Sequence, residues 1–300
     1  MFLNGLITND VKMLAVNTWM PAVFPNVQGR LLAAVRVIHR DDGFLIDTEA
    51  ATRVTVVKLL ERFTLAGDFR LADLTQDTAL LSIQGSKTPE IMAAIFGETP
   101  AIPDRNAVAS ADWHGKQITI IRATQTAEDG FDLFINATEA ENLRDALINA
   151  GAQPIGNDTI ETLRIEAGLA RHGVDMDETN VVMETNLDDA VSFTKGCYIG
   201  QEIIARIKYR GHVAKKLTGV IFSGAVSVES GAKIISADDK EIGRVTSVAF
   251  SPRLGRTIAL GYVKYDYLAP GTSVKVDSLG TKLGAEVAEL PFVRGSWHES

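Results

Sequence analysis

The stretch KGCYIGQEIIARIKYRGHVAKKLTGVIFS, residues 195–223, joins two parts of the chain that differ in character. It begins as a glycine-flanked loop that runs into a helix whose apolar positions include Ile203 and Ile207. From Gly211 onward, short segments with strand patterns are separated by Gly, Asp and Pro, which is typical of a small β-barrel or sandwich. We therefore predict a domain boundary near residue 211 and a C-terminal β-barrel domain over residues 211–300.

The residues before this boundary mix hairpins with helices. Two strands, 31–40 and 43–48, are joined by a tight turn, and a helix capped by Asp47 follows and ends at Gly67. Further strands are predicted at 69–75, 78–85, 116–124 and 129–136. Further helices are predicted from Pro89, from a capping box of Thr138 with Glu141, and from a second box of Asp158 with Glu161. This order predicts the α+β class rather than a doubly wound sheet, in one bilobed body over residues 1–210 whose second lobe covers roughly 45–110.

The composition is that of a soluble globular protein, because 46% of the 300 residues are apolar and 23% are charged. The net charge of -8 disfavours a polyanionic partner, so contact with nucleic acid is expected only at a local basic patch. No apolar run is long enough to span a membrane, and the N-terminus lacks a signal-peptide pattern and reads as part of the fold. These features predict a cytoplasmic protein, or one of the mitochondrial matrix if the source is eukaryotic.

Cysteine and histidine usage limits the kinds of site that the chain can hold. The single cysteine, Cys197, excludes an internal disulfide and a structural zinc site, and the five histidines lack metal-ligand spacing, so we predict no metal site. Asp175, Asp177 and Glu178 lack the pattern of a calcium loop and are expected to form a solvated acidic loop. No phosphate-binding glycine loop or serine-esterase motif is present in the sequence.

Cys197 lies in the glycine-flanked loop, on the N-terminal side of the predicted helix. The helix dipole and the ammonium of Lys195, two residues away, both favour a thiolate there, which would make the thiol more reactive. The alternative is that Cys197 is a small buried apolar residue. The flanking glycines favour the reactive thiol, because they let a ligand approach the backbone closely.

Several motifs, taken together, resemble a known family. KGCYIGQE (195–202) is preceded by ETNLDDAVSF (184–193) and LRIEAGLARHG (163–173), and further matches occur at FLNGLITNDV (2–11), NVQGRLLAAV (26–35) and GHVAKKLTGV (211–220). This set resembles the YgfZ-type folate-binding proteins, the iron–sulfur assembly branch of the glycine-cleavage T-protein (aminomethyltransferase) superfamily. The resemblance implies a ring of three subdomains around a central funnel that binds tetrahydrofolate, with a small β-barrel as the last subdomain.

The resemblance also assigns roles to individual residues. Glu184 lies where relatives place the glutamate that hydrogen-bonds the pterin, and a carboxylate suits the paired N–H donors of that ring. Lys195 and Cys197 match invariant positions of the motif and are our candidate catalytic residues. The other candidate cofactor-binding residues are Arg164, Gln201 and Lys216.

Each assignment has an ordinary structural alternative. Glu184 would then be a solvated loop carboxylate, Gln201 would cap the following helix, and Arg164 would form a surface pair with Glu166. Lys216 belongs to the one basic run of the chain, which would neutralise the glutamate tail of a folate, touch tRNA phosphates, or form only an exposed helix face and linker.

The sequence departs from the family pattern on the strand after NVQGR. Aminomethyltransferases carry an aspartate there that positions the folate nitrogen and the aminomethyl group, whereas this chain has Ala33 and Ala34, which cannot orient or transfer a proton. Relatives also carry a strand and turn before FLNGL, so the chain is expected to begin downstream of that strand or to lack it.

Three hypotheses for the function follow. The first is a tetrahydrofolate-binding accessory factor for iron–sulfur cluster assembly or repair, with iron–sulfur client or assembly proteins as partners and only indirect contact with tRNA. The second is a tetrahydrofolate-dependent one-carbon transferase of the aminomethyl type, with Glu184 at the pterin and another residue in place of the missing aspartate. The third is a scaffold that binds partners without folate. The missing aspartate favours the first hypothesis over the second.

Overall fold

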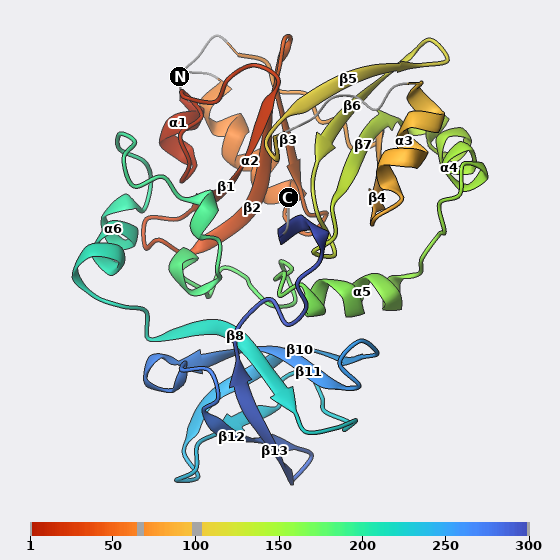
Figure 1. The fold of residues 1–300 in the computed structure, drawn as a ribbon. Helices are drawn as coiled ribbons and strands as arrows, with labels where there is room; N and C mark the ends of the chain where they lie inside the picture. Colours follow the sequence, from red (N-terminus) through yellow and green to blue (C-terminus); the bar gives the residue numbers. More distant parts are fainter. Residues whose placement is uncertain (1, 65–68, 98–103, 299–300) are drawn as a thin grey trace.

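The computed structural model of the chain describes residues 2–64, 69–97 and 104–298. In this part of the chain Figure 1 shows three bodies, with two open sheets side by side in the upper half and a closed barrel below them. The α+β class and the C-terminal β-barrel predicted from the sequence are confirmed.

The first lobe is a sheet of β1 (Thr18–Pro25), β2 (Leu31–Arg40) and β3 (Gly43–Thr48), in that order. Because side chains alternate along a strand, Ala33, Val35 and Val37 of β2 point to one face of the sheet. They pack there against apolar side chains of α1 (Leu3–Leu6) and α2 (Arg53–Thr64). The β2–β3 hairpin was predicted from the sequence. Strand β1 was not, because its segment TWMPAVFP contains two prolines, which are unusual within a strand.

The second lobe is a four-stranded sheet in the order β4-β7-β6-β5. Its strands are β4 (Thr78–Gln84), β5 (Val108–Trp113), β6 (Lys116–Arg122) and β7 (Gly130–Asn136). One face packs against α3 (Thr88–Phe96) and α4 (Ala140–Asn149). A small cluster that includes Ile38 of β2 and Phe134 of β7 joins the two lobes. The predicted limits of this lobe, 45–110, are wrong, because β6 and β7, which lie between β4 and β5 in the sheet, come later in the chain.

The third body is a closed barrel in the order β10-β11-β8-β13-β12-β9. Its strands are β8 (Lys215–Phe222), β9 (Lys233–Ile235), β10 (Glu241–Ser251), β11 (Arg256–Lys264), β12 (Ser273–Ser278) and β13 (Thr281–Ala288). Neighbouring backbones approach closely at Gly243, where a Cβ atom would lie 2.1 Å from the carbonyl oxygen of Tyr262. The boundary predicted near residue 211 lies between α6 (Gln201–Arg210) and β8.

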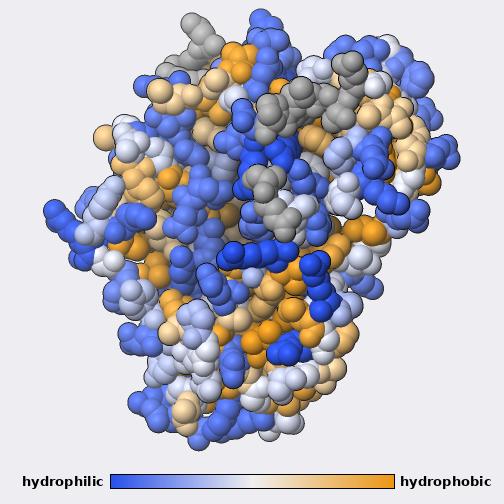
Figure 2. All heavy atoms as spheres, viewed as in Figure 1, coloured by the Kyte–Doolittle hydropathy of each residue, from blue (hydrophilic) through white to orange (hydrophobic). Residues whose placement is uncertain are grey.

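Helix α5 (Asn157–Glu166) lies on the side of the upper body that faces the barrel, and it packs against β10 and β11. Ile165 on this helix packs against Leu217 of β8 and against Ile258 and Leu260 of β11. Figure 2 shows apolar residues gathered on the visible face between the upper body and the barrel, in agreement with this contact. The barrel is therefore fixed to the upper body by burial of apolar surface, which is the dominant favourable contribution to folding.

The C-terminal segment returns from the barrel to the second lobe, between the two sheets (Figure 1). The hydroxyl oxygen of Ser296 accepts a hydrogen bond from the backbone N–H of Asp129 at 2.9 Å, and the Ser296 N–H donates to Glu128 at 3.1 Å. The N–H of Trp297 donates to the carbonyl of Ala127, also at 3.1 Å. These contacts link the end of the described chain to the turn before β7.

Some local predictions are wrong for identifiable reasons. Residues 69–75 form no strand, because Phe69 stacks on Phe2 and Leu71 packs on the first-lobe core without a partner strand. Asp47 does not cap α2, since it pairs with Arg36 across the β2–β3 hairpin. Neither predicted capping box forms. The side chain of Asn136 accepts a hydrogen bond from the Thr138 N–H, and the N-cap of α5 is Gly156, which has no side chain to cap the helix. The predicted helix end at Gly67 lies outside the described residues.

No helix in the described part of the chain is long and apolar enough to cross a membrane. The cellular compartment stays a prediction.

Candidate functional site

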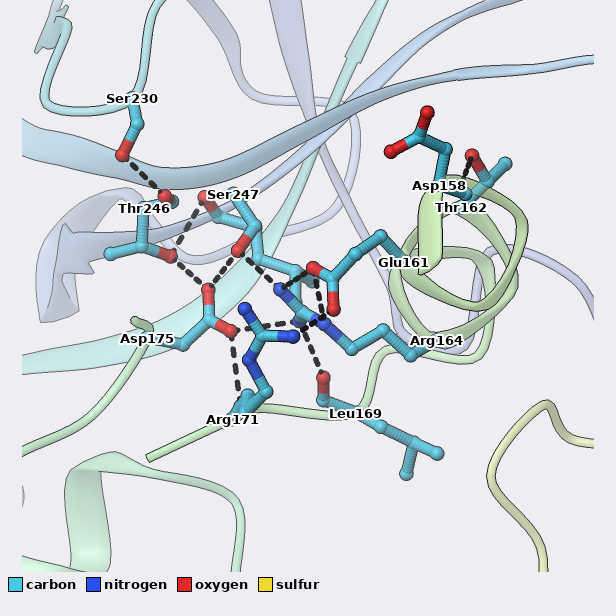
Figure 3. A network of polar contacts seen from close by, with 11 residues as sticks. Asp158, Glu161, Thr162, Arg164, Leu169, Arg171, Asp175, Ser230, Thr246 and Ser247 are labelled. Carbon is cyan, nitrogen blue, oxygen red and sulfur yellow. Dashed lines mark hydrogen bonds and ion pairs between the residues drawn. The ribbon is translucent and has the colours of Figure 1, made fainter. Parts of the chain in front are cut away.

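Arg164, on α5, is the centre of a buried polar network between the upper body and the barrel (Figure 3). Its Nη1 donates to the Asp175 carboxylate at 2.8 Å and to the carbonyl of Leu169 at 3.0 Å. Its Nη2 donates to Ser247 of β10, and Nε and Nη2 both reach Glu161. All five N–H groups of the guanidinium are used in this way. We therefore correct the prediction that Arg164 contacts the cofactor: it has no donor left for a ligand and holds the protein together instead.

Asp175 forms the other half of this network and is fully buried. Its Oδ1 accepts from the hydroxyls of Thr246 at 2.5 Å and Ser247 at 2.6 Å, while its Oδ2 accepts from the Arg171 N–H. The prediction of a solvated acidic loop is therefore wrong for Asp175. This carboxylate fixes the segment after α5 against strand β10.

Glu184 ends the short turn η2 (Val182–Glu184) and is 7% exposed. Its Oε2 accepts two long hydrogen bonds, from the Val181 N–H at 3.3 Å and from the Asn180 amide at 3.4 Å. Its Oε1 accepts none from the described residues and is not sealed from solvent. The alternative of a solvated loop carboxylate is therefore excluded. Glu184 is a nearly buried carboxylate with one oxygen available to a ligand.

Gln201 and Lys216 lie on the two elements that contact this turn. Gln201 is the first residue of α6 and Lys216 lies on β8, and both elements pack against η2. Lys216 pairs only loosely with Asp188, at 3.7 Å with both side chains partly exposed. A cavity of about 640 Å³ is lined by Asn180, Lys215 and Tyr262 among others, whereas Glu184, Gln201 and Lys216 are not among its lining residues. The turn that ends at Glu184 thus contacts the helix that begins with Gln201 and the strand that carries Lys216.

Lys195 makes contacts that the sequence did not suggest. Its Nζ donates to the carbonyl oxygens of Asn4 at 2.7 Å, Ile7 at 2.8 Å and Asn9 at 2.6 Å. Burial lowers the pKa of Lys195 to about 8, so the ammonium is still mostly protonated at neutral pH and donates all three protons. This side chain fastens the N-terminal segment to the loop that carries Cys197, which makes Lys195 a positioning residue in this structure.

Replacing Lys195 by methionine is expected to lower the free energy of unfolding by about 2 kcal/mol, because three nearly buried carbonyls lose a charged donor. The measurement is urea unfolding followed by circular dichroism. Lys12→Met is the matched control, since Lys12 is an exposed lysine beside the same loop, and it should change stability by less than about 0.5 kcal/mol. Equal losses in the two variants would contradict the anchoring role.

Cys197 is exposed, so the alternative of a buried apolar cysteine is wrong. The thiol borders a cavity of about 330 Å³ whose other walls include Phe2, Asn4 and Asp10. It lies three residues before Gly200, the N-cap of α6, in agreement with the predicted loop on the N-terminal side of a helix. This cavity shares no lining residue with the larger one near Asn180 and Lys215.

A second buried charge cluster lies between the two lobes and was missed in the sequence. Arg36 of β2 pairs with Asp47 of β3 at 2.7 Å and also with Asp132 of β7. Asp132 is fully buried, and its Oδ1 has no hydrogen-bond partner within the described chain. The alternation of β2 was the available signal, since it places Arg36 on the face opposite to the apolar core of the first lobe.

Comparison with known proteins identifies the family. The model of the GCVT N-terminal domain matches residues 1–195, and that of the glycine cleavage T-protein C-terminal barrel domain matches residues 215–294. An aminomethyltransferase of Saccharopolyspora erythraea is 31% identical over 265 residues, covering 86% of this chain and 72% of the relative. One of Herpetosiphon aurantiacus is 32% identical over 297 residues, covering 99% and 82%.

A solved structure shares the fold. The glycine cleavage system aminomethyltransferase T from Bartonella henselae superposes with a TM-score of 0.89 at 22% identity, over 98% of this chain and 81% of that one. These relatives also correct the resemblance drawn from the sequence, because they are named aminomethyltransferases and not YgfZ-type proteins. The two domain models together match most of the sequence, and the chain belongs to the glycine cleavage T-protein (aminomethyltransferase) family.

Proposed function

We propose that this protein is a tetrahydrofolate-dependent one-carbon transferase of the aminomethyl type. The family supports the reaction class, since its curated relatives are aminomethyltransferases, and tetrahydrofolate is the cofactor of this family, as the sequence had suggested. The observation that carries the proposal is Glu184, a nearly buried carboxylate with one oxygen that no described residue occupies. The role in iron–sulfur assembly predicted first is withdrawn, because the relatives that match over nearly the whole chain are transferases.

The Glu184 carboxylate suits the pterin end of the folate. The ring presents an amino group and a neighbouring N–H, which are paired donors that a carboxylate accepts with both oxygens. The two existing bonds to Oε2 are long, at 3.3 and 3.4 Å, so a ligand can compete for that oxygen as well. Tetrahydrofolate, when bound, supplies the nitrogen atoms that carry the one-carbon unit.

Residues around the Glu184 turn would bind the rest of the folate. Lys216 has a loose, partly exposed ion pair with Asp188 at 3.7 Å, which is worth little and can be exchanged for a carboxylate of the folate tail. Gln201 begins the helix that packs on the same turn and offers an amide to the ligand. Cys197 is exposed at the smaller cavity, so its thiol would be accessible to a donor of the one-carbon unit.

Tetrahydrofolate binding measured by isothermal titration calorimetry tests this proposal. Glu184→Gln is expected to weaken binding by roughly tenfold to hundredfold, because an amide N–H then faces the N–H donors of the pterin. Glu202→Gln, an exposed glutamate on the first turn of α6, is the matched control and should bind like the wild type. A wild-type protein that does not bind tetrahydrofolate would refute the proposal and favour a scaffold that works without folate.

A further inference from the structure

Glu49 follows β3 at the point where the sheet faces the Glu184 turn. The ladder between β2 and β3 ends at the pair Val35–Thr48, and the Thr48 hydroxyl donates to the carbonyl oxygen of Ala34 at 3.1 Å, so Glu49 follows at the end of the ladder, next to Ala34. Residues that face each other in an antiparallel pair point to the same side of the sheet, and neighbouring strands are about 4.8 Å apart. Continuing the register by one residue leads us to expect the Glu49 side chain beside Ala34, on the face opposite to the first-lobe core.

The residues around Ala34 connect this position to the folate region. Ala34 packs against the cluster that contains Val182 and Met183, the first two residues of the turn that ends at Glu184. Ala170 packs against the same cluster, just before Arg171 and His172. Glu49 therefore lies where the end of β3, the Glu184 turn and the segment after α5 converge.

The charge environment of Glu49 suits proton transfer. The side chain is exposed, and within the described part of the chain its carboxylate has no hydrogen bond or ion pair. Partial loss of surrounding water raises the pKa of Glu49, and Asp47 of β3 adds to this effect. The cations Arg171, His172 and Arg164 oppose it without forming a direct ion pair.

Two of these cations are already committed to other partners, which leaves Glu49 free to exchange its proton. Arg164 donates all its N–H groups within the buried network, and Arg171 pairs with Glu161. The Nδ1 atom of His172 is buried without a partner in the described chain, so this imidazole also has an unused polar group near Glu49. A carboxyl group that is solvent-accessible and unpaired, with its charged form disfavoured, is a suitable general acid and base.

We propose that Glu49 is the catalytic carboxylate of the transfer reaction, and this inference rests on the proposed function. When a folate N–H attacks the carbon of the aminomethyl group, a new C–N bond forms and the bond from that carbon to its donor atom breaks, with the electron pair passing to the donor atom. The attacking nitrogen must lose one proton and the donor atom must gain one. The Glu49 carboxylate takes the first proton and the resulting acid supplies the second, so no oxidant or reductant is needed. Strand β2 itself offers no carboxylate at Ala33 or Ala34.

The test combines turnover with binding in the full chain. The probe is 5,10-methylenetetrahydrofolate with ammonium and dithiothreitol as acceptors, and the rate at which the folate releases its one-carbon unit is followed across pH 5–9, while calorimetry measures tetrahydrofolate affinity. For Glu49→Gln we expect a rate lower by roughly 10²–10⁴-fold, tetrahydrofolate affinity within about twofold of the wild type, and loss of the limb of the pH profile that reports this carboxyl. Glu178→Gln, which removes an exposed glutamate from the neighbouring loop, is the matched control and should retain wild-type turnover.

The outcomes separate the two proposals. A Glu49→Gln rate equal to that of the wild type overturns the assignment of Glu49 while the transferase function stands. A Glu49→Gln variant that loses tetrahydrofolate affinity in proportion to its rate overturns the assignment as well, since the residue then acts in binding. A wild-type protein that neither binds tetrahydrofolate nor turns over the probe refutes the proposed function and Glu49 with it.

Discussion

Asp175→Ala is expected to lower the free energy of unfolding by about 3–5 kcal/mol, which would leave little of the stability of a typical domain. The substitution removes a fully buried carboxylate and leaves the buried Arg164 guanidinium with the partly exposed Glu161 as its remaining counter-ion among the described residues. It also removes the acceptor of the Ser247 hydroxyl and leaves the Thr246 hydroxyl with only its longer bond to the Leu260 carbonyl, at 3.2 Å, among the described residues. The cost arises mainly from the buried donors that lose their acceptor and from the weaker compensation of the Arg164 charge, because the intact ion pair is itself of modest value.

Chemical unfolding of this variant can be compared with two others. Asp177→Ala removes a half-exposed carboxylate whose only hydrogen bonds are local ones, to Thr179, and should cost less than about 1 kcal/mol. The double variant Arg164→Met with Asp175→Leu removes both charges and should recover part of the stability lost in Asp175→Ala. A stability of Asp175→Ala within 1 kcal/mol of the wild type would mean that this network contributes little.

Gly200→Ala is expected to lower the free energy of unfolding by about 3 kcal/mol. Gly200 is the N-cap of α6 with φ = 78°, in the left-handed region that L residues with a side chain adopt at a cost. A Cβ atom there would also lie 2.4 Å from the carbonyl oxygen of Asn26, which is backbone and cannot rotate away. The turn that contains Asn26 and the start of α6 would have to separate.

Gly196→Ala, in the same loop, is the matched control for this prediction. A Cβ atom at Gly196 would meet nothing within 4 Å, and the backbone there is not left-handed. We expect this variant to unfold at the wild-type urea concentration, while the midpoint of Gly200→Ala shifts to a clearly lower one. Equal midpoints for both variants would show that the turn and the helix move apart without cost.

The sequence predicted those parts of the fold that depend on local patterns. The β2–β3 hairpin was found because the turn at residues 41–43 and the alternation of β2 are visible within twenty residues. The barrel strands were found in the same way, except β13, whose alternation is broken by Gly284. Residues 69–75 have a strand pattern but no partner strand, and whether a partner exists depends on distant parts of the chain.

The candidate site shows the same difference between residues found from local motifs and residues whose surroundings depend on distant parts of the chain. The region around Glu184 came from a resemblance in motifs, and the structure shows its turn in contact with α6 and β8, which carry Gln201 and Lys216, whose roles in binding remain predictions. Asp175 was misjudged because its burial depends on Thr246 and Ser247, which lie 71 and 72 positions further along the chain. Glu49 lies in no motif, and its position follows from the end of the β2–β3 ladder at Thr48.

The return of the C-terminal segment to the turn before β7 has a consequence for synthesis of the protein. The backbone N–H of Asp129 finds its partner in Ser296, 167 residues later in the chain. At a translation rate of about 5–20 residues per second, roughly 8–33 s pass between the synthesis of Asp129 and that of Ser296. This contact can therefore form only after Ser296 has been made, whereas the contacts that join the two lobes, at Ile38 with Phe134 and at Arg36 with Asp132, can form once β7 is complete.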